Sequence, residues 1–341
     1  MRQFFCSFLL VYLFSFVFSP HFTYASNSPL EAQFQPLASK SLLLDITLVD
    51  QVRLVAVGQH GNILTSNDAI TWQQSSVPVQ STLTSVYFIN SLQGWAVGHD
   101  ATILHTSDGG YSWQVQQYLP NKEKPLLDVT FKDDLNGLAV GAYGLFYRTT
   151  DGGQTWHSEF HQEFLNADDT QYIADLKAED EAAYLDEIAS ILPHFNRIIQ
   201  DGRTLYLVGE IGLIAKSNDY GKHWQKFSEV YQGSFFDLAR THQANLLVVG
   251  LRGHIFRSLK NGSPWESIAS NTTALLNSVV LTDDNRIIIL ANNGVMLVSR
   301  DDGKTYKLQA QKDGKPLIAG VWFNHKLIVV SDVGIKIIKV K

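Results

Sequence analysis

Three acidic residues fall in equivalent turns of the chain, and pairs of carboxylates are what glycoside hydrolysis requires. Asp100, Glu210 and Asp332 each lie one or two residues after a small residue that closes a short apolar run. One carboxyl group could act as the acid and another as the nucleophile or base. Equivalent turns also collect carboxylates without any catalytic role. We therefore expect no enzyme and no catalytic residue, with a sialidase-like or endo-glucanase-like glycoside hydrolase as the alternative.

A pair of histidines offers a second kind of chemistry. His157 and His161 are four residues apart and could clamp a metal ion if that stretch were helical. The same spacing fits the end of an outer strand with both side chains in solvent, and no third ligand stands nearby. We expect no metal and no cofactor. The single cysteine, Cys6, lies near the N-terminus, so the rest of the chain has no thiol for a disulfide, a zinc-thiolate site or a nucleophile.

A repeat sets the positions of these residues. Its frame is a small residue, two variable residues and a glycine, with a Ser or Thr five positions later in most copies. The steps between successive copies are 40, 43, 68, 41, 41 and 40 residues, and the copies begin at Gly58, Gly98, Gly141, Gly209, Gly250, Ala291 and Ser331. A period near 40 with several short strands indicates an all-β fold, a seven-bladed β-propeller.

The second half of the repeat is an Asp-box (BNR repeat) pattern. A Ser or Thr is followed two residues later by Asp and seven later by an aromatic residue, as in TSDGGYSW and TTDGGQTW. A short carboxylate can accept hydrogen bonds from turn amides, and glycine permits positive φ. We therefore predict a structural role, at hairpin ends on the bottom face, for Asp68, Asp108, Asp151, Asp219 and Asp301. The first box has lost one residue, and the fifth has Lys260 in place of Asp.

The N-terminus has the pattern of an export signal. Arg2 precedes an apolar run from Phe4 to Phe18, and Thr23-Tyr24-Ala25 resembles a cleavage site. We predict a signal peptide at 1–25, cleavage near Ala25 and a periplasmic protein, with an uncleaved anchor as the alternative. Residues 26–341 are expected to form one propeller domain.

The seventh repeat stops at Lys341 after only three strands, so the last blade lacks its outer strand. We predict that Gln33 to Leu37 supplies it and closes the ring, because this piece is strand-like and lies outside the repeat count. The alternative is a mobile N-terminus.

The long step between the third and fourth copies indicates an insertion. Apolar residues from Ile173 to Leu192 recur at three- and four-residue intervals, which predicts an acidic helix over Asp168 to Leu192 that ends at Pro193. Residues 157–200 hold ten acidic residues against Lys177 and Arg197, a net charge of −8, whereas the rest of the chain carries +2. The insertion is either a solvated helix or an acidic docking arm. A nearly neutral body argues against nucleic-acid binding.

The seven repeats with their Asp-boxes, and the segments LTSVYFINSLQGWAVGHDATILHTSDGGYSW and LLVVGLRGHIFRS, resemble the photosystem II stability/assembly factor family over about residues 40–341. This resemblance implies a non-enzymatic, exported assembly factor that binds a membrane protein. For bacterial relatives it implies an association with an envelope transporter. Arg252 matches an arginine of the family's fifth-blade turn, while the acidic insertion departs from the family pattern.

Strand order places the partner site on one face, which we call the top face. In a four-stranded meander, the turn between strands two and three and the crossing to the next blade lie at the same end. We predict protein contacts there from His60, His99, Asp100, Tyr143, Glu210 and Arg252, with the insertion as a rim. The expected partner is a membrane or envelope protein, with no nucleic acid and no small-molecule cofactor, and the protein itself is expected to be a monomer.

Overall fold

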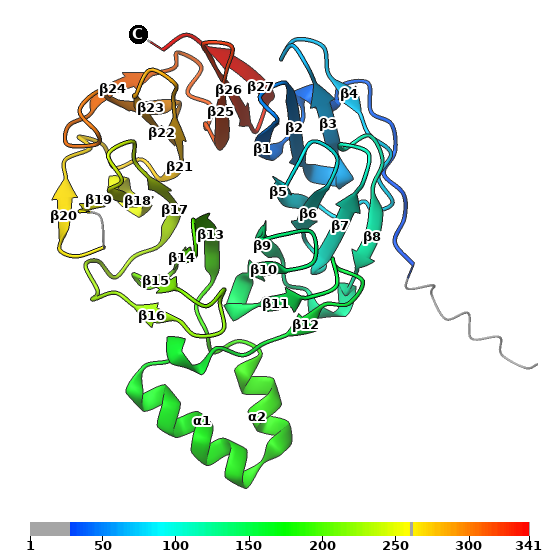
Figure 1. The fold of residues 1–341 in the computed structure, drawn as a ribbon, viewed down its shortest axis with the longest axis vertical. Coiled ribbons are helices and arrows are strands. Elements are labelled where there is room, and N and C mark those ends of the chain that lie inside the picture. Colours follow the sequence, from blue (N-terminus) through cyan, green and yellow to red (C-terminus); the bar gives the residue numbers. More distant parts are fainter. Residues whose placement is uncertain (1–27, 260–261, 341) are drawn as a thin grey trace, which may run out of the picture.

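The computed structural model describes residues 28–259 and 262–340 as a ring of seven antiparallel sheets around a central axis (Figure 1). Each sheet is one blade of a seven-bladed β-propeller, as the repeat predicts. The predicted signal peptide, its cleavage position and Cys6 lie outside the described residues.

Each blade is a meander whose strands follow in chain order. Blades 1 to 3 consist of β1 (Leu43–Val49), β2 (Arg53–Gly58), β3 (Ile63–Ser66), β4 (Gln73–Gln74); β5 (Leu83–Phe88), β6 (Gly94–Gly98), β7 (Thr102–Thr106), β8 (Gln114–Gln117); and β9 (Leu126–Phe131), β10 (Gly137–Gly141), β11 (Phe146–Thr149), β12 (His157–Ser158). Blades 4 and 5 consist of β13 (Phe195–Asp201), β14 (Thr204–Gly209), β15 (Ile214–Ser217), β16 (Gln225–Lys226); and β17 (Phe235–Arg240), β18 (Leu246–Gly250), β19 (Ile255–Ser258), β20 (Trp265–Ile268). Blades 6 and 7 consist of β21 (Leu276–Leu281), β22 (Ile287–Ala291), β23 (Val295–Ser299), β24 (Lys307–Ala310); and β25 (Ala319–Phe323), β26 (Lys326–Ser331), β27 (Gly334–Ile338).

The small residue that opens each repeat is the last residue of the second strand of its blade, where another part of the backbone passes close by. This strand is buried along its whole length in blades 2, 3 and 5, which is why it reads as a continuous apolar run. At Gly98 an added Cβ would lie 2.1 Å from the carbonyl oxygen of Thr82, on the crossing into the same blade. The same close approach to a carbonyl oxygen of the crossing occurs at Gly58, Gly141, Gly209 and Gly250, so only glycine fits in blades 1 to 5, whereas blades 6 and 7 have Ala291 and Ser331 at this position.

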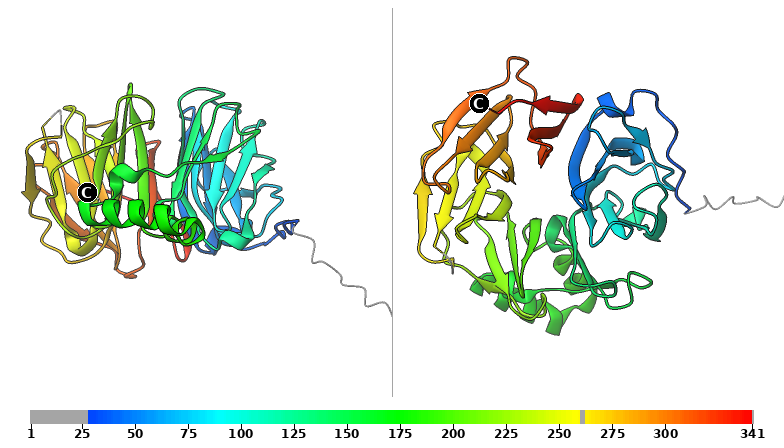
Figure 2. Two further views of the ribbon diagram at one scale, coloured as in Figure 1. Left: turned by 90° about the horizontal axis from the view of Figure 1, so that it is seen from below. Right: turned by 45° about the horizontal axis from the view of Figure 1, so that its top comes forward.

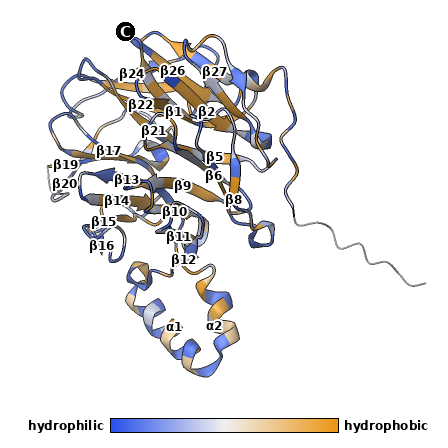
Figure 3. Cartoon of the chain, turned by 45° about the vertical axis from the view of Figure 1, so that its right-hand side comes forward, coloured by the Kyte–Doolittle hydropathy of each residue, from blue (hydrophilic) through white to orange (hydrophobic). Residues whose placement is uncertain are grey.

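Neighbouring blades are held by apolar packing and by arginine side chains. The Trp95 ring of blade 2 stacks on Phe131 of blade 3, with ring centroids 3.4 Å apart. The Arg148 guanidinium of blade 3 donates to the carbonyl oxygen of Tyr220 in the Asp-box of blade 4, at 2.8 Å. The strands of the blades consist largely of hydrophobic residues (Figure 3).

The prediction that Gln33 to Leu37 completes the last blade is wrong. Blade 7 has three strands in the described part of the chain, and the N-terminal segment instead follows the outer edge of blade 1. The Gln35 amide donates to Oε1 of Gln74 on β4, and the Gln74 side chain donates back to the carbonyl oxygen of Gln33. The Gln74 side chain thus bonds the amide of Gln35 and the carbonyl of Gln33, whereas β27 contacts the short 3₁₀ turn Ala38–Lys40.

The insertion also differs from its prediction, because it contains two helices within the described residues, α1 (Ala167–Glu179) and α2 (Glu181–Ile188). Asp180 separates them. Its backbone is extended, it ends α1, and its carboxylate accepts from the amides of Ala182 and Ala183 to begin α2. The insertion spans 159–194, so Arg197 belongs to the ring, and α2 ends five residues before Pro193. Seen edge-on, the helices lie across the outer edge of the ring (Figure 2).

Candidate functional site

The Asp-box aspartates organise hairpin ends. Oδ1 of Asp108 accepts from the amides of Tyr111 and Ser112, both at 3.0 Å, and Oδ2 accepts from the Ser112 hydroxyl at 2.6 Å. The Thr106 hydroxyl bonds Oδ1 of Asp108 and accepts from the amide of Gly110. Similar carboxylate-to-turn bonds are made by Asp68, Asp151, Asp219 and Asp301. Each of these carboxylates thus accepts hydrogen bonds from its own turn.

The turns of the top face share one strained backbone shape. Each turn in blades 1 to 6 contains a non-glycine residue with φ between 53° and 60°, and in blade 2 a second one, Ala101, follows with φ of 45°. The residues in the range 53° to 60° are His60, Asp100, Tyr143, Ile211, Arg252 and Asn293. In most of these turns a glycine follows and lies against the crossing into the next blade. At Gly61 an added Cβ would be 2.0 Å from the carbonyl oxygen of Val79. The backbone therefore holds the side chain before the glycine outward, whatever its type.

The predicted contact residues all lie in the turns of the top face, although they do not form one cluster. His60, His99 and Arg252 are exposed on separate blades. Asp100 is engaged locally, because its Oδ2 accepts from the Ser81 hydroxyl at 2.5 Å.

Two predicted contacts, Tyr143 and Glu210, meet through His194. The Tyr143 ring lies edge-on to His194 with centroids 4.5 Å apart, and Glu210 Oε1 lies 3.5 Å from His194 Nδ1. The Lys124 ammonium lies 5.3 Å from the Tyr143 ring centroid. These residues come from blades 2, 3 and 4, so the crossing at the insertion is where the predicted surface becomes continuous.

The three carboxylates considered for hydrolysis are each held within their own part of the ring. Asp100 bonds Ser81, Glu210 faces His194, and Asp332 lies 3.6 Å from the Lys315 ammonium. They belong to blades 2, 4 and 7, on different sides of the ring (Figure 1). The structure thus assigns each a local partner and gives no paired arrangement of the acid and base type.

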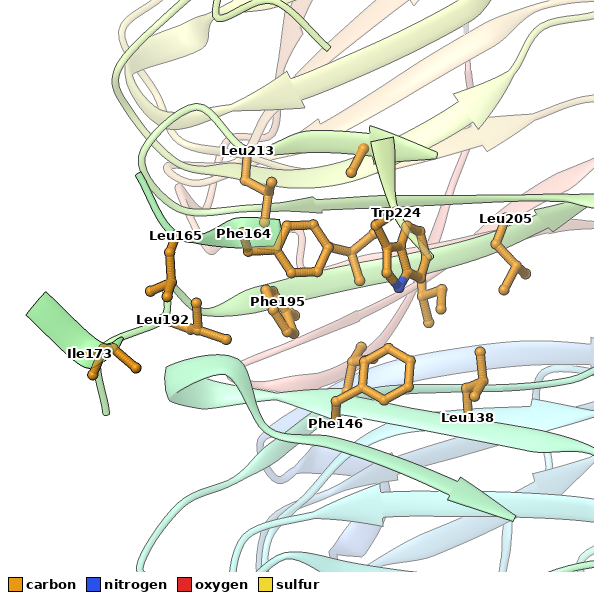
Figure 4. Close-up of a cluster of buried hydrophobic side chains, with 14 residues drawn as sticks. Leu138, Phe146, Phe164, Leu165, Ile173, Leu192, Phe195, Leu205, Leu213 and Trp224 are labelled. Atoms are coloured by element: carbon orange, nitrogen blue, oxygen red, sulfur yellow. The ribbon is translucent and has the colours of Figure 1, made fainter. Parts of the chain in front are cut away.

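Beside Glu210, the insertion and blade 4 enclose a groove of about 380 Å³, which sequence reasoning did not locate. Its buried apolar walls come from Phe164 and Leu165 of the insertion and from Leu213 and Ile214 of blade 4. In the close-up, Phe164 lies beside Leu213, with Phe195 and Trp224 nearby (Figure 4). The ring centroids of Phe164 and Phe195 are 4.9 Å apart. The groove thus has an apolar wall of packed, buried side chains.

The root of the insertion is fixed by a buried polar cluster. His161 Nδ1 lies 3.0 Å from Glu163 and Nε2 lies 3.3 Å from Glu159, which also pairs with Arg148. Burial would lower the pKa of His161, but both carboxylates outweigh it and raise the pKa above the ordinary 6.5. Burial would raise the pKa of Glu159, but His161 and Arg148 lower it to about 2. His157 stands apart, exposed on β12, so the two histidines considered as a metal clamp do not converge.

A second group missed from sequence lies on the axis of the ring. Arg197 Nη1 is 3.3 Å from Asp128 and its Nε is 3.5 Å from Asp237, while Asp45 faces the same space. Asp45, Asp128 and Asp237 all stand 13 residues before the glycine that opens their repeat, a fixed offset that would have revealed them. Burial raises the pKa of Asp45 and Asp237, with Arg197 opposing it.

Neither a metal cluster nor a membrane-crossing helix is found in residues 28–259 and 262–340. No three or more His, Cys, Asp or Glu side chains are grouped there so that they could hold a metal ion. The two helices of the same residues are too short and too polar to cross a bilayer.

The chain is similar to known assembly factors. The sequence model of the photosynthesis system II assembly factor YCF48 matches residues 64–125. The photosystem II assembly protein Ycf48 of Thermosynechococcus vestitus is 29% identical over 234 residues, which cover 68% of this chain and 60% of the relative. The photosystem II assembly lipoprotein Ycf48 of a Picosynechococcus species is 25% identical over 234 residues, 67% of this chain and 61% of the relative. The aligned region thus spans about three fifths of these relatives.

A solved structure described as YCF48 bound to D1 peptide has the same fold. It superposes with a TM-score of 0.66 at 19% identity, covering 90% of this chain and 97% of that one. At this identity the likeness establishes the seven-bladed architecture.

Proposed function

Since the chain is a seven-bladed propeller of the photosystem II assembly factor-like type, we propose that it is an exported, non-enzymatic assembly or accessory factor for a membrane protein complex of the envelope, such as a transporter. Its relatives are named as assembly proteins, and one as a lipoprotein. The N-terminal pattern, with cleavage near Ala25, supports a periplasmic location.

The observation that carries this proposal is the gathering of binding features on the top face. The turn residues and the root of the insertion lie at the same end of the blades, and Tyr143, His194 and Glu210 link blade 3 to blade 4 there. A solved propeller of this fold is described as bound to a peptide of D1. A scaffold of this kind works through its loops.

The test is capture from the envelope. The mature protein should retain an integral membrane protein from detergent-solubilised envelope, identified by mass spectrometry. A deletion of 168–189 closed by a short glycine linker should retain less of it, because loop changes cost little closure entropy and the ring stays folded. The deletion keeps Phe164, Leu165 and Leu192, which pack into blade 4. An equal yield from the folded deletion variant, or no membrane protein captured by the full chain, would contradict the proposal.

A further inference from the structure

The groove beside Glu210 differs in charge from the rest of the ring. Asp169, Glu210 and Glu229 lie among its lining residues, and Lys226 is the one basic residue among them in the described chain. The Lys226 ammonium donates to the carbonyl oxygen of Leu165 at 2.9 Å, so its charge is directed at the insertion root. The insertion, 159–194, adds ten acidic residues against Lys177 alone. The groove therefore combines an apolar wall with a negative rim.

The lip of the groove carries an unusual residue. Ile211 has φ of 53°, a left-handed conformation that β-branched residues rarely adopt. Its side chain is 69% exposed, so burial does not compensate for the strain. Strain of this kind concentrates at binding sites. An apolar side chain held in solvent at the mouth of an apolar groove offers a contact to a partner.

From these features we infer that the groove binds a peptide segment of the partner in which bulky apolar residues are flanked by lysine or arginine. This inference rests on the proposed function and names the chemistry of its partner. The apolar side chains would lie against Phe164 and Leu213, and the basic side chains would face Glu210 and Glu229. A volume of about 380 Å³ accommodates one or two large side chains.

The test uses purified protein and a labelled nine-residue peptide with a central Leu-Phe pair and two lysines on each side. Fluorescence anisotropy should show saturable binding. A peptide with glutamates in place of the lysines, and one with serines in place of the Leu-Phe pair, should each bind at least about tenfold more weakly. If all three peptides bind equally or none binds, the inference is wrong. Capture of the membrane protein in the experiment above would then still support the proposed function.

Two variants tie the binding to the groove. Glu229→Lys should weaken the lysine peptide about tenfold, while Asp186→Lys, the same charge change on the exposed part of α2, should leave its affinity unchanged. If both variants lose the same affinity, the peptide is attracted by the overall charge of the insertion, and the assignment of binding to the groove is wrong. Ile211→Asn should bind the peptide more weakly yet melt no lower than the parent, because asparagine tolerates the left-handed backbone. A concentration-dependent dimer abolished by Glu229→Lys would instead assign the groove to a second copy of the chain.

Discussion

At the scale of single residues, the Asp-box shows how one carboxylate sets a hairpin end. Sequence alone predicts this role for Asp108, because the spacing to Thr106 and Trp113 is local and the hydrogen bonds follow from it. The aspartates of the axis group share a fixed offset in the repeat, but their contact with Arg197 is not visible in the sequence, since Asp45, Asp128 and Asp237 are 152, 69 and 40 residues away and meet it only when the ring closes. Local spacing predicts turns, whereas contacts between blades depend on how the strands are placed around the axis.

Replacing Asp108 by alanine should lower the free energy of unfolding by roughly 1–2 kcal/mol, because the turn amides of Tyr111 and Ser112 lose their acceptor. Chemical denaturation measures the change. Asp134→Ala is a matched control, an exposed aspartate in a turn at the same end of the blades, and should stay within about 0.5 kcal/mol. If Asp108→Ala abolished partner binding while the melting temperature stayed constant, the structural role would be refuted.

At the scale of elements, the sequence predicts the blades well, but it predicts the helical insertion and the N-terminal segment poorly. The strand positions follow from the glycine turns, so the seven repeats give seven blades. The break between α1 and α2 was missed because Asp180 fits a helical pattern, yet its side chain caps the next helix. The N-terminal segment was misplaced because hydropathy gives no preference between the edges of blades 7 and 1. In the structure, the segment lies on blade 1, where the Gln74 side chain bonds its backbone at Gln33 and Gln35.

The root of the insertion should respond to pH through His161. Its folded-state pKa is raised above 6.5, so protonated His161 contributes stability below about pH 6.5, and this contribution is lost as the pH rises through the folded value. Urea denaturation should therefore give a lower unfolding free energy for the parent at about pH 8.5 than at about pH 6.

In His161→Gln this decline should be smaller. The exposed neighbour His157 provides the control, because His157→Gln should keep the parental pH dependence. A parental decline retained in full by His161→Gln would show that folding does not raise the pKa of His161.

At the scale of the whole molecule, the ring is held together at its axis as well as between neighbouring blades. Arg197 on blade 4 faces Asp128 on blade 3 and Asp237 on blade 5, and Asp45 on blade 1 lies in the same central space. Asp128 also accepts from the amide of Ile198 and from the Ser85 hydroxyl, which links three blades. The last blade has three strands in the described part of the chain, and we expect the contacts on the axis to help stabilise the closed ring.

Arg197→Met tests this central group. The three carboxylates would lose their only nearby positive charge among the described axis residues. The unfolding free energy should fall by about 3 kcal/mol, near the lower end for breaking a buried pair, because about a third of the Arg197 side chain is exposed. The deficit should shrink as the pH is lowered from about 7 to about 5. Burial already raises the pKa of Asp45 and Asp237, and without Arg197 the folded state would retain their protons to still higher pH.

Denaturation curves of parent and variant at the two pH values measure this deficit. Adding Asp237→Asn to Arg197→Met should restore part of the loss at about pH 7, since it removes one of the uncompensated charges. A deficit that is the same at both pH values, and that the second substitution does not reduce, would mean that Arg197 acts through packing alone and that the charges on the axis do not hold the ring together.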